Sequence, residues 1–152
     1  MEEFNTIEKV KELFKSIDAL GKEDTFFVAC QDKQYVSGME AGMEYPYDGL
    51  LIDDNEKGIS MFYLKGSALS GLISLSSPSK MTLEKENHIF IPAEDIKEII
   101  IKKFALLNNK TKRIQINTID GKSHKLYANV DEKDFPYHKD NFEKFMNKYG
   151  AK

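Results

Sequence analysis

The residues that could carry out chemistry in this chain are few and widely separated. Cys30 is the only thiol, and it lies in the apolar run of residues 25–31, where a cysteine behaves as a small buried hydrophobe far more often than as a nucleophile. The three histidines, His88, His124 and His138, form no His-x-x-His pair. The ligands of one metal ion usually come at short, fixed spacing, so the sequence predicts no metal site. Because Cys30 lies in an apolar run, the sequence predicts no catalytic cysteine either.

A run of polar residues from Asp53 to Glu56 has two chemical interpretations. Adjacent carboxylates such as Asp53 and Asp54 can do general acid–base work when their surroundings separate their pKa values, but nothing in the sequence indicates such a separation. The run also begins like a calcium-binding loop, in which oxygen ligands occupy positions one, three, five and twelve. Positions five and twelve are Lys57 and Leu64 here, so we interpret the run as a solvent-exposed hairpin turn.

The residues around Gly121 do not form a phosphate-binding loop. The tripeptide Gly121-Lys122-Ser123 matches the end of such a loop, but Ile116 stands where the motif requires an earlier glycine. The tripeptide also lies between two expected strands, whereas a phosphate-binding loop leads from a strand into a helix. With no Gly-x-Ser-x-Gly motif either, the sequence favours a protein that is not an enzyme and holds no cofactor. An unrecognised small-molecule enzyme is the remaining alternative.

Length and composition describe a single globular domain. The chain has 152 residues, of which 41% are hydrophobic and 31% charged, and its formal net charge of −3 is too small for a disordered chain. One cysteine excludes a disulfide framework and suits a reducing compartment. No run approaches the roughly 18 apolar residues that a membrane span needs, and the chain starts Met-Glu-Glu without a basic and apolar leader. We therefore expect a cytoplasmic protein.

Charge is distributed unevenly along the chain. Acidic residues dominate the first third, whereas residues 97–125 contain eight lysines and arginines against two acids. The acidic balance of the whole chain argues against nucleic-acid binding, for which a basic domain is expected. The basic segment could still contact phosphate groups of a membrane or a ligand, or it could simply solvate the outer face of a sheet. The candidate contact residues are Lys110, Lys112, Arg113 and Lys122.

Two helices and about seven strands are expected to position these residues. Apolar residues recur every three or four positions from Phe4 to Leu20, which predicts an amphipathic helix over residues 1–21 that ends at Gly21. A second helix is predicted over residues 138–149. Because strands and helices do not alternate, we expect an antiparallel α+β fold rather than a parallel sheet. The strand signals cover residues 25–31, 34–37, 50–53, 59–64, 73–75, 88–91, 96–104, 112–119 and 124–130.

Two turns and one uncharged segment lie between these strands. Asn108-Asn109 and Asp120-Gly121 carry turn chemistry and predict two hairpins, the second with a two-residue loop. Residues 66–79 contain no charge, and their large aliphatic residues include Leu69 and Leu72. Such a segment is typical of a protein interface when it is exposed, and the alternative is that its leucines belong to the core. Leu69 and Leu72 are therefore candidates for binding a partner or a second copy of the chain.

The C-terminal part of the chain resembles a known family. It is similar to the back half of bacterial pleckstrin-homology-like (PH-like) domains, including the GRAM-like branch, over residues 88–149, while residues 25–77 agree by strand count. The resemblance implies an α+β fold over residues 25–150, in which a C-terminal helix caps a strongly bent antiparallel sheet or partly open barrel. The N-terminal helix is then an addition. The residues that carry the likeness are Ile91-Pro92, the run EDIKEIIIKK of residues 94–103, Ile114-Gln115-Ile116, Asp120-Gly121-Lys122 and the run NFEKF of residues 141–145.

The same resemblance implies a binding scaffold, which takes anionic lipids in some members and peptides or further copies of itself in others. The lipid site of the family usually lies in the first loop between strands and is rich in lysine and arginine. In this sequence that loop is Asp32-Lys33 or the acidic residues 38–48, so the usual basic residues are missing. We therefore expect a protein-binding or self-assembling module without a nucleic-acid partner. The alternative is weak contact with an anionic membrane or a phosphorylated ligand through residues 97–125.

Overall fold

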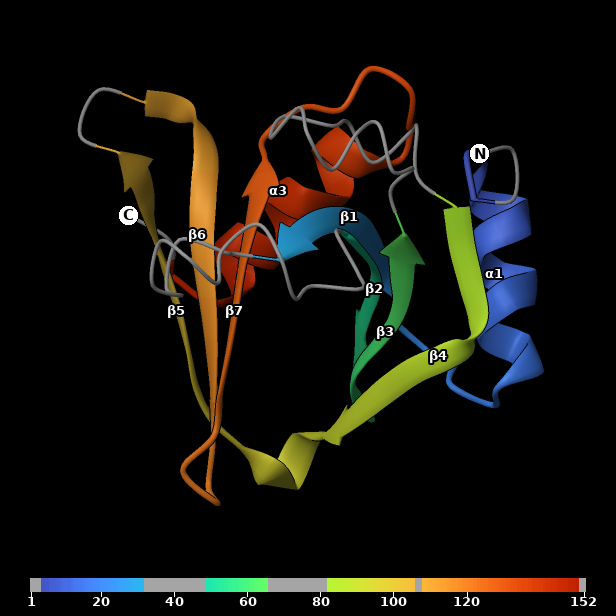
Figure 1. Cartoon of the computed structure of the whole chain (residues 1–152), viewed down its shortest axis with the longest axis horizontal. Coiled ribbons are helices and arrows are strands. Elements are labelled where there is room, and N and C mark those ends of the chain that lie inside the picture. The colour runs from blue at the N-terminus through green and yellow to red at the C-terminus, as the bar shows by residue number, and fades with distance from the viewer. Residues whose placement is uncertain (1–3, 32–48, 66–81, 106–107, 151–152) are drawn as a thin grey trace.

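The computed structural model describes residues 4–31, 49–65, 82–105 and 108–150 of the chain. Within these ranges it contains a helix, seven antiparallel strands and a second helix, with a short 3-10 turn between the fourth and fifth strands (Figure 1). The predicted antiparallel α+β fold is thus confirmed. The elements are α1 (Ile7–Ser16), β1 (Thr25–Gln31), β2 (Gly49–Asn55), β3 (Gly58–Lys65), β4 (Thr82–Pro92), η3 (Ala93–Asp95), β5 (Ile96–Ala105), β6 (Asn108–Thr118), β7 (Ser123–Asn129) and α3 (His138–Lys148).

All seven strands belong to one sheet, in the order β4-β3-β2-β1-β7-β6-β5. β4 and β5 follow each other in sequence through η3, yet they lie at opposite edges of the sheet. Figure 1 shows how this is achieved: the sheet bends strongly, so that the arm of β1–β4 and the arm of β5–β7 meet again at η3. In the part of the chain that the structure describes, β4 and β5 do not pair, so the sheet is not closed into a barrel.

The sheet bends at β1, which changes partners along its length. Six residues of β1 pair with β2, but only Cys30 and Gln31 pair with β7, opposite Tyr127 and Leu126. The earlier residues of β1 therefore diverge from β7. Their backbone groups on that side need other partners, because a buried N–H or C=O group without one costs about 1–3 kcal/mol.

Helix α3 supplies those partners. The amide of Asn141 donates to the carbonyl of Phe26 at 3.0 Å, and the N–H of Val28 donates to Nδ1 of His138 at 3.2 Å. Because Nδ1 accepts, Nε2 of the neutral ring carries the hydrogen, which it donates to the carbonyl of Asn129 in β7 at 2.6 Å. Burial lowers the pKa of His138 and so favours this neutral form. His138 thus bridges the gap between β1 and β7, while Asn141 gives the Phe26 carbonyl of β1 its partner.

The inner strands β1 and β2 of the first arm are covered on both faces, which explains why every residue of β2 is buried. On the outer face, Phe14 of α1 lies against Phe26 and Phe62, with ring centroids 5.6 and 5.1 Å away. On the inner face, Phe145 of α3 lies against Phe27 at 4.6 Å. Full burial of one such side chain contributes roughly 1.5–3 kcal/mol. The N-terminal helix therefore packs on its own domain, and the two faces form two separate core clusters.

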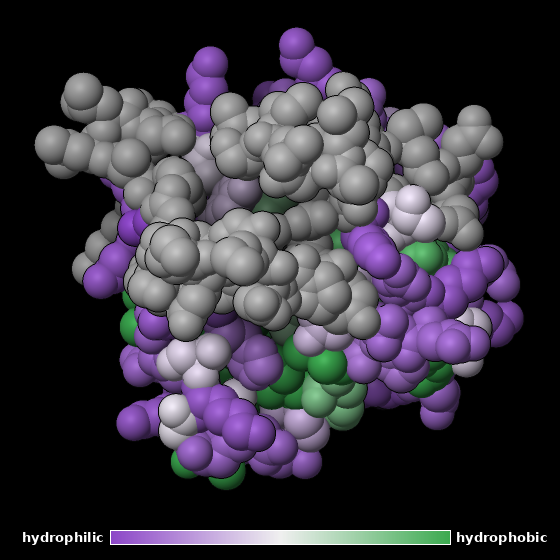
Figure 2. Space-filling model, viewed as in Figure 1, coloured by the Kyte–Doolittle hydropathy of each residue, from purple (hydrophilic) through white to green (hydrophobic). Residues whose placement is uncertain are grey.

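The surface of the described residues is largely hydrophilic. Figure 2 shows this for the face seen in Figure 1, where hydrophobic residues reach the surface mainly between the two arms of the sheet. Among the large apolar residues that the structure describes, Ile7, Phe90 and Ile119 are exposed, and they belong to α1, β4 and the β6–β7 loop. These three residues are spread over different elements and are normal for a globular surface.

Helix α1 is shorter than the apolar pattern predicts. Thr6 caps its start by accepting a backbone N–H, and the helix ends at Ser16 rather than next to Gly21. Asp18 then takes the left-handed backbone conformation, with a φ of 57°, which aspartate tolerates better than most residues. Ala19 still packs into the core from this irregular segment. The apolar spacing therefore continues beyond the helix, and the predicted end at Gly21 is wrong.

The C-terminal helix and the hairpins follow the sequence more closely. α3 is followed, as predicted, by Gly150 in the left-handed conformation with a φ of 70°. The β2–β3 and β6–β7 hairpins are present, but the loop of the second exceeds two residues because β6 ends at Thr118 and β7 begins at Ser123. The hairpin predicted at Asn108-Asn109 is present as β5–β6, but the predicted position of its turn is wrong, because Asn108 already belongs to β6 and lies opposite Ala105 of β5.

Replacing His138 tests whether α3 holds the bend. His138→Leu keeps a buried side chain of similar size but leaves the Val28 N–H and the Asn129 carbonyl without partners. We expect it to lower the free energy of unfolding by about 2–5 kcal/mol. Asn141→Ala should cost about 1 kcal/mol, and Lys139→Ala, at an exposed position beside His138, less than about 0.5 kcal/mol. Urea denaturation measures all three, and equal effects of the first and third substitutions would contradict the bridging role.

Candidate functional site

An open cleft of about 470 Å³ lies where the C-terminal end of α3 approaches β5. Apolar side chains and two cations share its concave surface, a composition typical of binding sites. The lining residues come from two elements far apart in the sequence: Ile99, Ile100, Ile101, Lys102 and Lys103 of β5, and Tyr149 and Gly150 after α3.

β5 forms one edge of the sheet. Its hydrogen-bonded neighbour is β6, and within the described ranges no strand pairs with its other side. The pairing with β6 is regular from Glu98 to Lys103 and irregular at both ends, between Ile96 and Glu98 and between Lys103 and Ala105. The regular stretch contains the β5 residues that line the cleft. Its outward N–H and C=O groups therefore form a row that could pair with another strand.

The side chains of this stretch alternate between the core and the surface. Ile101 is buried, and Ile99 packs partly against the same core cluster. Lys102 lies on the other face of the sheet, opposite Arg113 of β6. Lys103 shares the face of Ile101 but is exposed. Cations therefore project on both sides of the edge.

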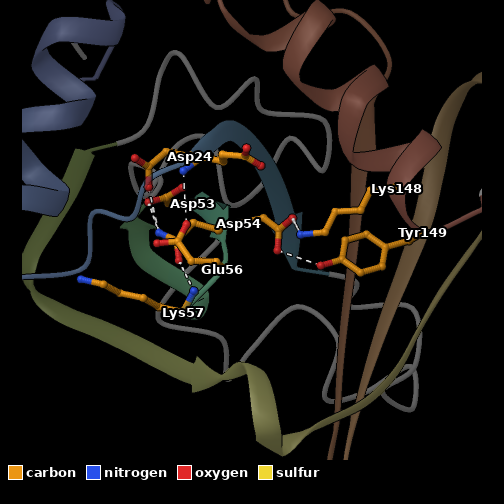
Figure 3. A network of polar contacts seen from close by, with 9 residues as sticks. Asp24, Asp53, Asp54, Glu56, Lys57, Lys148 and Tyr149 are labelled. Carbon is orange, nitrogen blue, oxygen red and sulfur yellow. Dashed lines mark hydrogen bonds and ion pairs between the residues drawn. The ribbon is translucent and has the colours of Figure 1, made fainter.

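A buried carboxylate fixes the other wall of the cleft. Asp54, whose side chain is 2% exposed, accepts a hydrogen bond from the Tyr149 hydroxyl at 2.9 Å and pairs with Nζ of Lys148 at 3.0 Å (Figure 3). The Tyr149 ring also lies against Phe145, with 4.9 Å between the ring centroids. The tyrosine that lines the cleft is thus held from β2.

The protonation of this triad follows from its burial. Burial raises the pKa of Asp54, and the hydrogen bonds from Lys148 and Tyr149 oppose that shift by stabilising the carboxylate. Burial and the neighbouring Asp54 raise the pKa of Tyr149 to about 12, so the hydroxyl keeps the hydrogen that it donates. Burial alone would lower the pKa of Lys148, but the bond to Asp54 outweighs it and raises the pKa. Asp54, Lys148 and Tyr149 therefore form a bonded triad that holds the Tyr149 ring at the cleft.

Asp53 and Asp54 do not form a catalytic pair, because they point to opposite faces of β2. Successive side chains of a strand alternate, so Asp54 faces α3 and Asp53 faces the side that α1 covers. Both are buried, as is Asn55, whereas Glu56 and Lys57 are exposed. The interpretation of this run as a solvent-exposed turn is therefore wrong for its first three residues. The reason is that β2 continues through Asn55 and is buried along its whole length.

The four basic candidates do not form one patch. Lys110, Lys112 and Arg113 lie in the first half of β6, whereas Lys122 lies in the β6–β7 loop, beyond the other end of that strand. Lys112 and Arg113 are consecutive strand residues and so project to opposite faces. Arg113 shares its face with Lys102, which is opposite it in register. The structure therefore pairs Arg113 with Lys102, another cation of the basic segment 97–125.

The remaining candidates lie elsewhere in the chain. Leu69, Leu72 and the strand predicted over residues 34–37 lie outside the described residues. Cys30 is buried, as predicted. Of the described helices, none is long and apolar enough to cross a membrane. Across residues 4–31, 49–65, 82–105 and 108–150, no three His, Cys, Asp or Glu side chains gather where they could hold a metal ion.

Comparisons with family models, curated proteins and solved structures gave no match to this chain. The cleft beside β5 is therefore the strongest basis for a function. Its signal in the sequence is weak: the isoleucines and lysines of residues 96–104 predict a strand. They do not reveal that the strand lies at an edge, or that Tyr149 returns beside it.

Tyr149→Phe tests the role of the buried carboxylate. The variant keeps the ring but removes one donor from Asp54, and a hydrogen bond to a charged group contributes about 1.5–3 kcal/mol. We expect the free energy of unfolding to fall by about 1–2 kcal/mol at neutral pH. The loss should shrink as the pH falls, because the donor stabilises only the ionised carboxylate.

Lys148→Met is the comparison for this measurement. The Lys148 side chain is 51% exposed, so solvent screens its ion pair and the loss should be smaller than that of Tyr149→Phe. Denaturation of both variants at neutral and acidic pH gives the two differences. If Tyr149→Phe is as stable as the wild type at neutral pH, Asp54 does not hold the ring.

Proposed function

We propose that this chain is a protein-binding module of PH-like architecture that takes an extended peptide segment as an added strand along β5. The observation that carries the proposal is the cleft beside this edge, where β5 has no second strand partner among the described residues and its outward backbone groups lie next to Ile99 and Tyr149. An added strand gains affinity from main-chain hydrogen bonds and specificity from the side-chain pockets beside it. The ionisable groups that line the described cleft are two lysines and a tyrosine, which suits binding better than catalysis.

The strand order supports the PH-like part of the proposal. Four strands of the first arm and three of the second are joined by the short pairing of β1 with β7, and a C-terminal helix fills the gap there. This arrangement agrees with the bent, partly open barrel that the resemblance of residues 88–149 implies. α1 is then an addition that covers the outer face of the first arm.

Charge favours a foreign peptide over a second copy of the chain. Lys102 and Lys103 are exposed at the cleft, and Lys97 is exposed further along the same strand. Two β5 edges paired with each other would bring six of these cations and only two Glu98 carboxylates to one interface, and such an excess of like charge opposes association. A partner strand with aspartate or glutamate would gain roughly 0.2–1 kcal/mol from each opposite-charge pair. We therefore infer an acidic, extended segment of another protein.

Selection from a random-peptide display library on the full chain tests this function. We expect enrichment of peptides that contain acidic residues, and their binding should shift the backbone amide NMR signals of residues 99–103. Lys102→Glu combined with Lys103→Glu should weaken binding about tenfold, equivalent to about 1.4 kcal/mol. Lys122→Glu combined with Lys139→Glu makes the same change of charge at exposed positions outside the cleft and should leave the affinity unchanged. Peptides that map to another surface, or no enrichment, would overturn the proposal.

The strand register favours one further candidate, contact of the outer face of β5–β7 with an anionic surface. Lys102 and Arg113 lie opposite each other on that face, and Lys125 of β7 shares it, because Arg113 is opposite Tyr127 and residues two apart share a face. Each cation near an anionic membrane contributes roughly 1 kcal/mol, so three would give weak binding.

Co-sedimentation with vesicles tests this second candidate. The chain should bind vesicles that contain phosphatidylserine and not neutral ones, and less at physiological than at low salt. Arg113→Glu should reduce the bound fraction severalfold, whereas Lys112→Glu, the same change on the opposite face, should reduce it little. Equal effects of the two variants would contradict the outer face as the contact, and no binding at low salt would eliminate this candidate.

A further inference from the structure

Where the chain leaves α1 and enters β1, it crosses the β2–β3 hairpin and is held by hairpin side chains. The amide of Asn55 donates to the carbonyl of Ala19 at 2.9 Å. The carboxylate of Glu56 accepts the backbone N–H of Lys22 at 2.8 Å. At Gly21 the contact is so close that an added Cβ would stand 2.5 Å from the Glu56 carboxylate. The crossing therefore depends on the side chains of Asn55 and Glu56.

The polar side chains beneath this crossing offer more hydrogen-bond acceptors than donors. Besides the Ala19 carbonyl, Nδ2 of Asn55 lies 2.8 Å from Oδ1 of Asp24 and 3.0 Å from Oδ2 of Asp53 (Figure 3). Three oxygens thus share two amide hydrogens. The N–H of Gly21 donates to Asp24 at 2.7 Å. The second oxygen of Asp53, Oδ1, is fully buried, and no group in the described chain donates to it.

One additional proton, held by the carboxyl groups of Asp24 and Asp53, supplies the missing hydrogen-bond donor. Asp24 and Asp53 both lie against Nδ2 of Asn55, so a proton held between the two carboxyl groups adds to the hydrogens that Asn55 and the Thr25 backbone supply, and it removes one of two adjacent negative charges. Burial, together with the bond and the charge of Asp24, raises the pKa of Asp53 to about 9. The geometry and the electrostatics therefore agree on a protonated pair at neutral pH.

We propose that Asp24 and Asp53 share one proton while α1 is docked, and that alkalinity loosens α1 by withdrawing that proton. The connection to the helix is short. The N–H of Ala19 bonds to the carbonyl of Phe14 at 2.9 Å, and Phe14 is the residue of α1 that covers Phe26 on the outer face. Loss of the proton places a second charge beneath the crossing and weakens the attachment of α1 to the sheet.

The direction of the effect follows from proton linkage. When α1 leaves the sheet, Asp53 becomes solvated and its pKa falls to the ordinary aspartate value near 4. Between that value and about 9, undocking releases one proton. The docking equilibrium therefore weakens about tenfold for each unit of pH in this range. Above the range the docked pair has also lost its proton, and the dependence ends.

Few titratable groups lie near the pair on this face. Directly beside Asp53, β3 and β4 present Ser60 and Phe90, and neither titrates. Further along the same face, His88 of β4 is exposed and lies against the Phe62 ring, with 5.6 Å between the ring centroids. Because Asp53→Asn leaves His88 in place, loss of the slope in that variant assigns the slope to the pair. The charged neighbours are all exposed, and Asp54 points to the opposite face of β2. Hydrogen bonds from the Lys22 backbone lower the pKa of Glu56 and so favour its ionised form. The exposed charged neighbours are Lys22 and Glu23 of the crossing and Glu56 and Lys57 of the hairpin.

Amide hydrogen exchange of the intact chain between pH 5 and pH 8 tests the proposal. After correction for intrinsic exchange, the opening of the α1 amides should rise about tenfold per pH unit, while the amides of β2 and β6 should not follow. Asp53→Asn keeps the shape without the titrating proton and should abolish the slope in α1. Asp54→Asn, the same change on the opposite face, should retain it.

The carbon-13 shift of the Asp53 carboxyl group in the wild type gives a readout that does not depend on the folding of any variant. We expect the shift of a protonated carboxyl group at pH 7. An ionised Asp53 at that pH would overturn the proposal, and so would the lack of a slope in α1. A slope that Asp53→Asn leaves unchanged, or equal slopes in α1 and β2, would do the same.

Discussion

The rest of this structure depends on the bend of the sheet at β1. β1 pairs with β2 over six residues but with β7 over only two. Buried backbone N–H and C=O groups of β1 on the β7 side therefore need other hydrogen-bond partners. His138 and Asn141 provide the missing partners, which fixes the start of α3 between the two arms. With the start fixed, the length of the helix determines where it ends. Tyr149 reaches the side of β5, Asp54 holds its hydroxyl, and the cleft results from this meeting.

The two arms of the sheet differ in what they leave for binding. β1 and β2 carry α1 on one face and α3 on the other, so the side chains of both faces are buried, whereas most of the edge strand β4 is exposed or half-buried. β5–β7 pack their inner face and present a polar outer face and the edge of β5. Most buried contacts therefore lie in the first arm, and the edge proposed for binding lies in the second. β2 serves both sides, because Asp54 supports the cleft while Asp53 and Asn55 hold the crossing from α1.

Local patterns in the sequence predict the elements, whereas long-range geometry decides what those elements do. Apolar spacing predicts α3 and its end at Gly150, because a helix depends on residues close in sequence. The same spacing overestimates α1, since Ala19 is buried without being helical. The run at Asp53 predicts exposure, because acidic residues next to a turn are normally solvated and nothing local reveals that β2 is buried on both faces. The edge position of β5 depends on which strands pair, which the sequence does not show.

The most direct test of the bend is the hydrogen bond from the Val28 N–H to Nδ1 of His138. It can be measured as a nitrogen–nitrogen coupling across the hydrogen bond in a nitrogen-15-labelled sample. We expect a measurable coupling together with the hydrogen on Nε2, since Nδ1 must accept while Nε2 donates to Asn129. A neutral ring with its hydrogen on Nδ1, and no coupling to Val28, would contradict this. α3 would then not be held between β1 and β7, and the cleft beside β5 would lose its physical cause.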